Sequence, residues 1–150
     1  MPLFSDILRL VKQQNVTRLS IQPKADCVKE SLAIIKNLNA EPWVGFNDGS
    51  LSKMQEVKKE AKAIPVFWDR PADSDIDKDL KIAKKEGFES IVFNHLGITK
   101  AKVDKVHKAG LEVGEWTVNN PVRINTLLGM GIDRICTNHP RTLIKILEEK

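Results

Sequence analysis

The sequence predicts an α/β protein built from parallel βα units. Short apolar or β-branched segments alternate with amphipathic segments of helical period along all 150 residues. The centres of the short segments recur roughly every 21 to 26 residues, which leaves room for one helix between neighbouring strands. Strands that alternate with helices in this way form parallel sheets with right-handed crossovers. No linker interrupts the pattern, so we expect one domain over residues 1–150.

Six short runs rich in β-branched and aromatic residues predict the strands. Pro65 is compatible with its strand because a missing N–H does little harm at the first positions. In chain order the expected strands cover residues 17–22, 43–46, 64–68, 90–94, 111–118 and 134–137.

The helices are predicted from apolar residues at helical spacing and from capping residues. Ser5, Asp26, Asp75 and Thr99 are each expected at a helix N-cap, where a side-chain oxygen accepts a hydrogen bond from an unpaired N–H. Gly87 is expected to end the fourth helix. Ser50 or Ser52 is expected to open the third helix, Pro121 and Pro140 to stand first in the last two, and Gly129 or Gly131 to end the sixth. The expected helices cover residues 3–14, 26–38, 50–61, 75–86, 99–110, 121 to 129 or 131, and 140–150.

Polar residues at the ends of the strands favour a barrel over an open doubly wound sheet. An open sheet gathers such residues at one switch point and often carries a glycine-rich phosphate loop, which is absent here. A 150-residue chain is short for a closed barrel, which usually needs about 200 residues or more. We therefore expect a TIM-type (β/α) barrel, incomplete, with six of its eight βα units. The polar strand ends are Gln22, Asn47, Asp69, Asn94, Asn119 and Asn138.

Composition and charge argue against a nucleic-acid partner and against a membrane span. The net charge of +4 comes from 24 basic and 20 acidic residues that are scattered along the chain, whereas nucleic-acid binders gather basic and aromatic residues on one face. No apolar run approaches the roughly 20 residues of a membrane span. Cys27 and Cys136 fit no metal-binding spacing and are expected as reduced thiols. Because the N-terminus also lacks a secretory signal, we expect a cytoplasmic protein with no nucleic-acid partner.

Residues 103–143 contain W-T-V-N at 116–119, followed by G-I-D-R-I-C-T-N-H-P at 131–140. Together these motifs resemble the C-terminal third of the glycerophosphodiester phosphodiesterase family. Earlier segments resemble the same family in the same order. They are L-S-I-Q-P-K at 19–24, G-F-N at 45–47 and V-F-W-D-R-P at 66–71, so the resemblance covers the last six βα units of the family's barrel.

The resemblance implies metal-assisted hydrolysis of a small-molecule glycerophosphodiester to glycerol phosphate and an alcohol, with calcium or magnesium as the cofactor. The family's H-R-G and E-x-D elements, which carry both acid/base histidines and two metal carboxylates, do not occur in these residues. Gln22 stands where the family has a metal-binding glutamate, and an amide oxygen binds such a cation more weakly. We therefore expect a chain that lacks the first two βα units. The alternative is a catalytically inactive remnant that binds a phosphorylated ligand or a partner chain.

The resemblance assigns substrate contacts to residues at the strand ends. Lys24 would contact the phosphate, although a solvated lysine after a proline is the plainer interpretation. Trp116 would line the pocket for the alcohol group, or fill the core. Phe46 and Asn94 end their strands at the same rim, where each either lines the pocket or serves in packing and capping.

The resemblance assigns no catalytic residue to this chain. His95 and His139 follow strands, and histidine is the residue type used most often for proton transfer near neutral pH, so they are the candidates for that role. Neither matches a catalytic histidine of the family, and His139 precedes a helix start where a capping role is the alternative. The first residues of the last helix form a further candidate anion site. An incomplete barrel also leaves two unpaired strand edges, which predicts self-association.

Overall fold

The computed structural model describes residues 2–149 of the chain. These residues form two compact units. Unit 1 takes in the chain up to Trp68 together with Glu86–Phe88, and unit 2 takes in Asp69–Lys85 and the chain from Glu89 onward. That all residues form a single domain stays a prediction.

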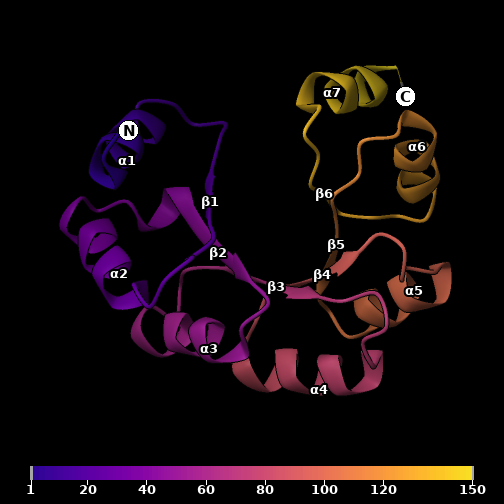
Figure 1. Cartoon of the computed structure of the whole chain (residues 1–150), viewed down its shortest axis with the longest axis horizontal. Coiled ribbons are helices and arrows are strands. Elements are labelled where there is room, and N and C mark those ends of the chain that lie inside the picture. Colours follow the sequence, from indigo (N-terminus) through magenta and orange to yellow (C-terminus); the bar gives the residue numbers. More distant parts are fainter. Residues whose placement is uncertain (1, 150) are drawn as a thin grey trace. The chain divides into compact units, whose positions relative to one another are not determined.

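Unit 1 is a parallel α/β unit. Its strands pair in the order β1, β2, β3, with Ile21 opposite Phe46 and Phe46 opposite Val66. In Figure 1 its helices lie outside the strands, and α2 packs beside α3. Its core is apolar and includes Leu8, Ile35, Phe46, Met54, Val57 and Trp68. The elements are α1 (Phe4–Val11), β1 (Leu19–Ile21), α2 (Val28–Asn37), the 3₁₀ turn η1 (Glu41–Trp43), β2 (Val44–Asp48), α3 (Leu51–Glu60) and the start of β3 (Val66–Arg70).

Unit 2 repeats this arrangement. Strands β4, β5 and β6 are parallel and pair in that order, with Asn94 opposite Trp116 and Gly114 opposite Arg134. Helix α5 packs on β5, and α6 packs beside α7 (Figure 1). Its core includes Ile91, Phe93, Val103, Val106, Val113, Ile124 and Leu127. The elements are α4 (Ile76–Glu86), β4 (Ser90–Asn94), α5 (Lys100–Lys108), β5 (Glu112–Trp116), α6 (Pro121–Gly129), β6 (Arg134–Ile135) and α7 (Pro140–Glu148).

Three of the predicted helix starts are confirmed by side-chain caps. The Ser50 hydroxyl accepts from the N–H of Lys53, and the Thr99 hydroxyl accepts from that of Lys102. Asp75 Oδ1 accepts from two N–H groups of the first turn of α4. Because each cap satisfies an otherwise unpaired donor, it fixes where the helix begins.

Two predicted caps are wrong. Helix α1 begins at Phe4 after an extended Leu3, which places Ser5 inside the first turn. Helix α2 begins at Val28 after Cys27, so Asp26 lies one residue too early to cap it.

Strand β3 begins one residue after Pro65. Pro65 joins the sheet only through its carbonyl oxygen, which accepts a hydrogen bond from the Phe46 N–H at 2.9 Å.

The terminal helices keep apolar residues on the surface. Leu10 on α1 is 65% exposed, and Ile144 and Leu147 on α7 are 52% and 51% exposed. Within residues 2–149, β1 pairs only with β2 and β6 pairs only with β5. Such edges and faces favour association with another chain, and self-association stays a prediction. No helix of the described chain is both long and apolar enough to cross a membrane.

Candidate functional site at the strand ends

The turn after β1 carries the predicted phosphate and metal residues, Lys24 and Gln22. Both are exposed, and the Lys24 ammonium donates to Gln22 Oε1. The buried Pro23 between them is held by α3, because Lys53 Nζ donates to its carbonyl oxygen at 2.6 Å. The structure therefore brings these two predicted residues together on an anchored turn.

The side chains around Gln22 do not provide the oxygen ligands that a calcium or magnesium ion needs. Its amide oxygen already accepts from a positively charged ammonium, which repels a second cation. A search of residues 2–149 finds no cluster of three His, Cys, Asp or Glu side chains that could hold a metal. Both cations prefer several oxygen ligands, carboxylates above all. The described residues alone thus do not form the metal site that the resemblance implies.

The prediction that Phe46 ends its strand is wrong, because β2 continues through Phe46 to Asp48. Phe46 is fully buried and lies in register with Ile21 and Val66, so it packs in the core of unit 1. The next residue, Asn47, accepts a hydrogen bond from Ser20 Oγ at 2.8 Å. A direct contact between Phe46 and a substrate stays a prediction.

In unit 2, Asn94 and Trp116 end neighbouring strands and lie opposite each other. Asn94 Oδ1 accepts from the Leu96 N–H at 3.1 Å, in the turn that follows β4. Trp116 is half-buried, and its indole N–H has no hydrogen-bond partner among the described residues. A buried donor without an acceptor is rare in folded proteins. A contact between the Trp116 N–H and a substrate oxygen stays a prediction.

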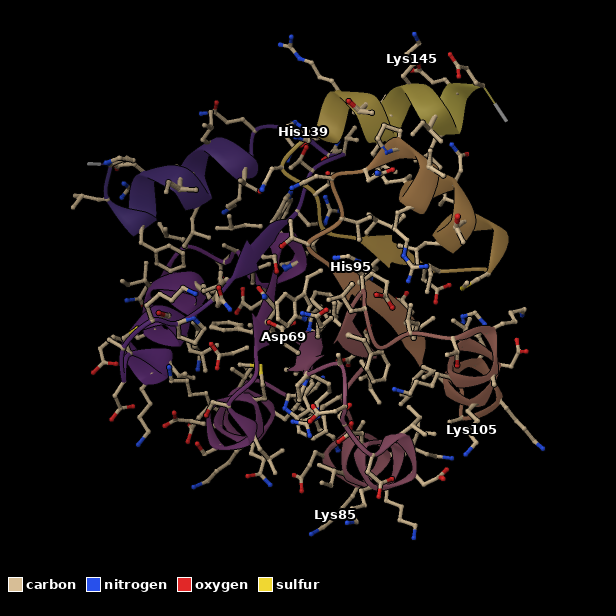
Figure 2. The ribbon with its side chains drawn as sticks, turned by 45° about the vertical axis from the view of Figure 1, so that its right-hand side comes forward. Asp69, Lys85, His95, Lys105, His139 and Lys145 are labelled. Atoms are coloured by element: carbon tan, nitrogen blue, oxygen red, sulfur yellow. The ribbon has the colours of Figure 1, made fainter. Side chains whose placement is uncertain are left out.

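The structure does not bring the two candidate histidines together. His95 follows β4, and its buried Nδ1 lacks a hydrogen-bond partner within the described chain. His139 is exposed and immediately precedes α7, whose N-terminus it does not cap with its side chain. In Figure 2 the two residues lie well apart, on different loops of unit 2. An acid/base pair formed by these histidines has no support in this arrangement.

The two halves of the sequence motif, residues 116–119 and 131–140, are joined by hydrogen bonds. Asn119 Oδ1 accepts from the Asn138 N–H at 2.9 Å and from Thr137 Oγ1 at 3.2 Å. Asp133 Oδ2 accepts from the Val113 N–H at 2.8 Å and lies 2.8 Å from His107 Nε2. These motif residues hold the loops of unit 2 in place.

Glu115 is a residue that the sequence analysis did not single out. It is fully buried in β5, and neither carboxyl oxygen has a hydrogen-bond partner among the residues described. Burial raises the pKa of Glu115 to about 8, and the positive charges of Arg123 and Lys102 only partly offset this. The signal in the sequence was a glutamate in the middle of a predicted strand, one position before Trp116.

Comparison with known proteins identifies the family. The sequence model of the glycerophosphoryl diester phosphodiesterase family matches residues 7–142. The chain belongs to this family. A curated relative, the glycerophosphodiester phosphodiesterase of Bacillus altitudinis, is 25% identical over 157 residues, which cover 99% of this chain and 63% of the relative.

Solved structures confirm the fold class. A glycerophosphodiester phosphodiesterase from Parabacteroides distasonis matches with a TM-score of 0.85 at 18% identity, over 99% of this chain and 64% of that one. A phosphodiesterase from Oleispira antarctica, solved with the product sn-glycerol-3-phosphate, matches with a TM-score of 0.82 at 14% identity, over 98% of this chain and 61% of that one. The prediction of an α/β, partial TIM-type barrel is correct, and the chain spans less than two thirds of these relatives' length.

Proposed function

We propose that the protein acts in the hydrolysis of glycerophosphodiesters to glycerol phosphate and an alcohol, and that this chain's residues bind the phosphorylated substrate. Family membership over residues 7–142 supports the reaction class. The substrate-binding role is supported by the position of Lys24, which follows a strand whose sequence resembles the family's phosphate-binding segment.

The charge of Lys24 is the observation that carries this proposal. Its ammonium group bonds to the neutral amide of Gln22, and no carboxylate within residues 2–149 forms an ion pair with it. An ammonium group has three donors, so a phosphate oxygen can be added without removing the Gln22 bond. Because the charge is uncompensated, a phosphate would gain both a hydrogen bond and an ion pair. Trp116 is proposed separately as a contact for the alcohol group, and Asn94 and Phe46 are each proposed as further substrate contacts.

Chemistry beyond binding needs groups that the described residues do not place. The side chains near Gln22 do not provide the oxygen ligands of a divalent cation, so we assign no step to a metal held by this chain. His95 is the better-placed candidate for moving a proton, because its Nδ1 is buried and has no partner in the described part of the chain. Its role as an acid or base is a proposal that mutation can test.

The second candidate is binding without hydrolysis, either of a phosphorylated ligand or of a partner chain. The separation of His95 from His139 and the occupied oxygen of Gln22 favour it. The exposed apolar residues of α1 and α7 suit a partner chain. Both candidates share the phosphate contact of Lys24 and differ in whether a bond is broken.

Release of glycerol 3-phosphate from glycerophosphocholine separates the two candidates. The assay is run on the full chain with calcium, with magnesium and with chelator. Release that is lost in Lys24→Ala but kept in Lys84→Ala supports hydrolysis, because Lys84 is an exposed lysine on α4 with the same charge. No release in any arm, together with phosphate-ester binding that depends on Lys24, supports the binding function. If the chain neither releases glycerol 3-phosphate nor binds a phosphate ester, both candidate functions are contradicted.

A further inference from the structure

A buried carboxyl group without hydrogen-bond partners among the described residues lies within the electrostatic reach of two cations in unit 2. Glu115 is fully buried, and no hydrogen bond reaches either of its oxygens from the described residues. Lys102 on α5 and Arg123 on α6 are close enough for their charges to act on it. A buried, ionised carboxylate is costly unless it is paired. The group is therefore held in its neutral form while the two cations are engaged elsewhere.

Both cations are engaged by the loop that follows β4, residues 95–99. Arg123 Nη2 donates to the carbonyl oxygen of His95 at 2.5 Å. Lys102 Nζ donates to the carbonyl oxygen of Gly97 at 2.7 Å and to that of Ala72 at 3.3 Å. Two side chains from two helices thus hold the 95–99 loop through backbone carbonyls.

The 95–99 loop is packed tightly where Lys102 holds it. A Cβ atom added to Gly97 would lie 2.0 Å from the carbonyl oxygen of Ala72, so the two backbones approach as closely as glycine allows. Two neighbouring carbonyl oxygens repel each other unless a cation bridges them, and the Lys102 ammonium does so here. Withdrawing the ammonium would leave this contact without its bridge.

We propose that Glu115 is a pH-sensitive switch for the 95–99 loop. With Glu115 protonated, Lys102 and Arg123 stay on the loop carbonyls and hold it in the form described above. With Glu115 ionised, the carboxylate draws one or both cations toward itself and releases the loop. The proposal rests on the contacts within unit 2 and does not depend on the proposed hydrolysis.

Relative hydrogen-bond strength gives the direction of the switch. A charged donor binds a carboxylate more strongly than it binds a neutral carbonyl, and burial increases the difference. Ionisation of Glu115 therefore favours exchange of carbonyl contacts for carboxylate contacts. Since burial sets the pKa of Glu115 at about 8, release is expected as the pH rises through that value.

Among the described residues, the Cys136 thiol is another titratable group whose pKa depends on the charge of Glu115. The backbone N–H of Cys136 donates to the Glu115 carbonyl oxygen at 2.8 Å, and the uncharged Ile135 lies opposite Glu115 on β6. Burial raises the pKa of the Cys136 thiol, and the charges of Asp69 and Glu115 raise it further. Ionisation of Glu115 therefore keeps the thiol protonated, so the two groups do not lose their protons together. The Phe93 side chain opposite Glu115 on β4 carries no charge.

The methyl group of Ile98 reports on the loop, because Ile98 lies inside it and is buried. The test follows methyl NMR spectra of the full chain from about pH 6 to about pH 9.5, spanning the expected titration. We expect the Ile98 signal to shift toward its unstructured position with a midpoint near pH 8. Ile35 in the core of unit 1 should stay unchanged over the same range.

Three variants separate the switch from other titrations. Glu115→Gln keeps the neutral shape and should abolish the Ile98 shift. Glu112→Gln, on the same strand but paired with Arg134, should leave the shift intact. Cys136→Ser should also leave it intact. A wild-type Ile98 signal that does not move, or one that still moves in Glu115→Gln, would overturn the proposal.

A direct titration of the Glu115 carboxyl group in the wild-type chain tests the proposal even if a variant fails to fold. The carboxyl carbon of Glu115, labelled in the wild-type chain, should titrate with the same midpoint as the Ile98 methyl group. A Glu115 midpoint below about pH 6, or one clearly different from that of Ile98, would overturn the proposal without any substitution.

Discussion

Asn119 Oδ1 accepts a hydrogen bond from the backbone N–H of Asn138 at 2.9 Å. This contact joins the segment after β5 to the segment after β6, and so connects the two halves of the motif through which the sequence resembles its family. The motif thus includes a structural joint as well as candidate substrate residues. Its specificity for the family is understandable, because each half supplies a partner that the other needs.

Replacing Asn119 by alanine should weaken unit 2. The Asn138 N–H and the Thr137 hydroxyl would lose their acceptor, and the free energy of unfolding should fall by about 1 kcal/mol for this exposed site. Asn119→Asp keeps an oxygen acceptor at the same place and should retain most of the stability. Urea denaturation of the three proteins measures this, and equal losses in both variants would show that the acceptor is not the cause.

Asp133 is predicted to stabilise the fold above the pH at which it loses its proton. Burial alone would raise its pKa, but the Val113 N–H and His107 lower it below the usual value. A lowered pKa in the folded state means stability that is present above about pH 4 and lost as the pH falls through the folded pKa. Asp133→Ala should therefore destabilise the chain at neutral pH by about 1–3 kcal/mol. The difference from wild type should shrink in strong acid, as followed by denaturation at several pH values.

Glu115 is predicted to lower the stability of the fold as the pH rises, the opposite of the effect of Asp133. Its folded pKa of about 8 lies above its ordinary value of 4.5, so the folded chain favours the protonated form. Its contribution to stability is fully present below about pH 4.5 and is lost as the pH rises toward 8. Glu115→Gln should thus gain stability over wild type by a few kcal/mol near pH 8 and little near pH 4.5. A constant difference across this range in thermal or urea melts would contradict the assignment.

Gly97 and Gly129 form a matched pair for testing the close approach of the 95–99 loop. An added methyl group at Gly97 would meet the Ala72 backbone, whereas one at Gly129 would meet nothing within 4 Å. Gly97→Ala should lower the free energy of unfolding by about 1–3 kcal/mol through overpacking. Gly129→Ala, at the end of α6, should be neutral or slightly stabilising. If both variants unfold at the same urea concentration, the loop is not as tightly packed as described.

Much of the fold was predictable because its signals are local. Strand β4 lies where the sequence predicts it, Ser90–Asn94, and Thr99 caps α5 through its own hydroxyl. A buried apolar run and a capping residue act within a few positions, so one sequence suffices to find them. The expected caps at Ser5 and Asp26 failed because α1 and α2 begin after Leu3 and Cys27, and neither helix start has a side-chain cap.

The site was less predictable because its contacts join residues far apart in the chain. Nothing in the sequence indicates that the charges of Lys102 and Arg123 act on Glu115, since the three residues belong to different elements. The bond between Lys24 and Gln22 depends on a turn whose shape is set by Lys53 on another helix. Family resemblance supplied the residue types of the site, and only the structure supplied their partners.

The central claim is that Lys24 binds a phosphate ester, and calorimetric titration of the full chain with sn-glycerol 3-phosphate tests it most directly. We predict saturable binding that Lys24→Ala weakens at least about tenfold, a loss of about 1.4 kcal/mol, while Lys84→Ala leaves it unchanged. Binding of equal strength in wild type and Lys24→Ala, or no binding by wild type, would contradict the claim.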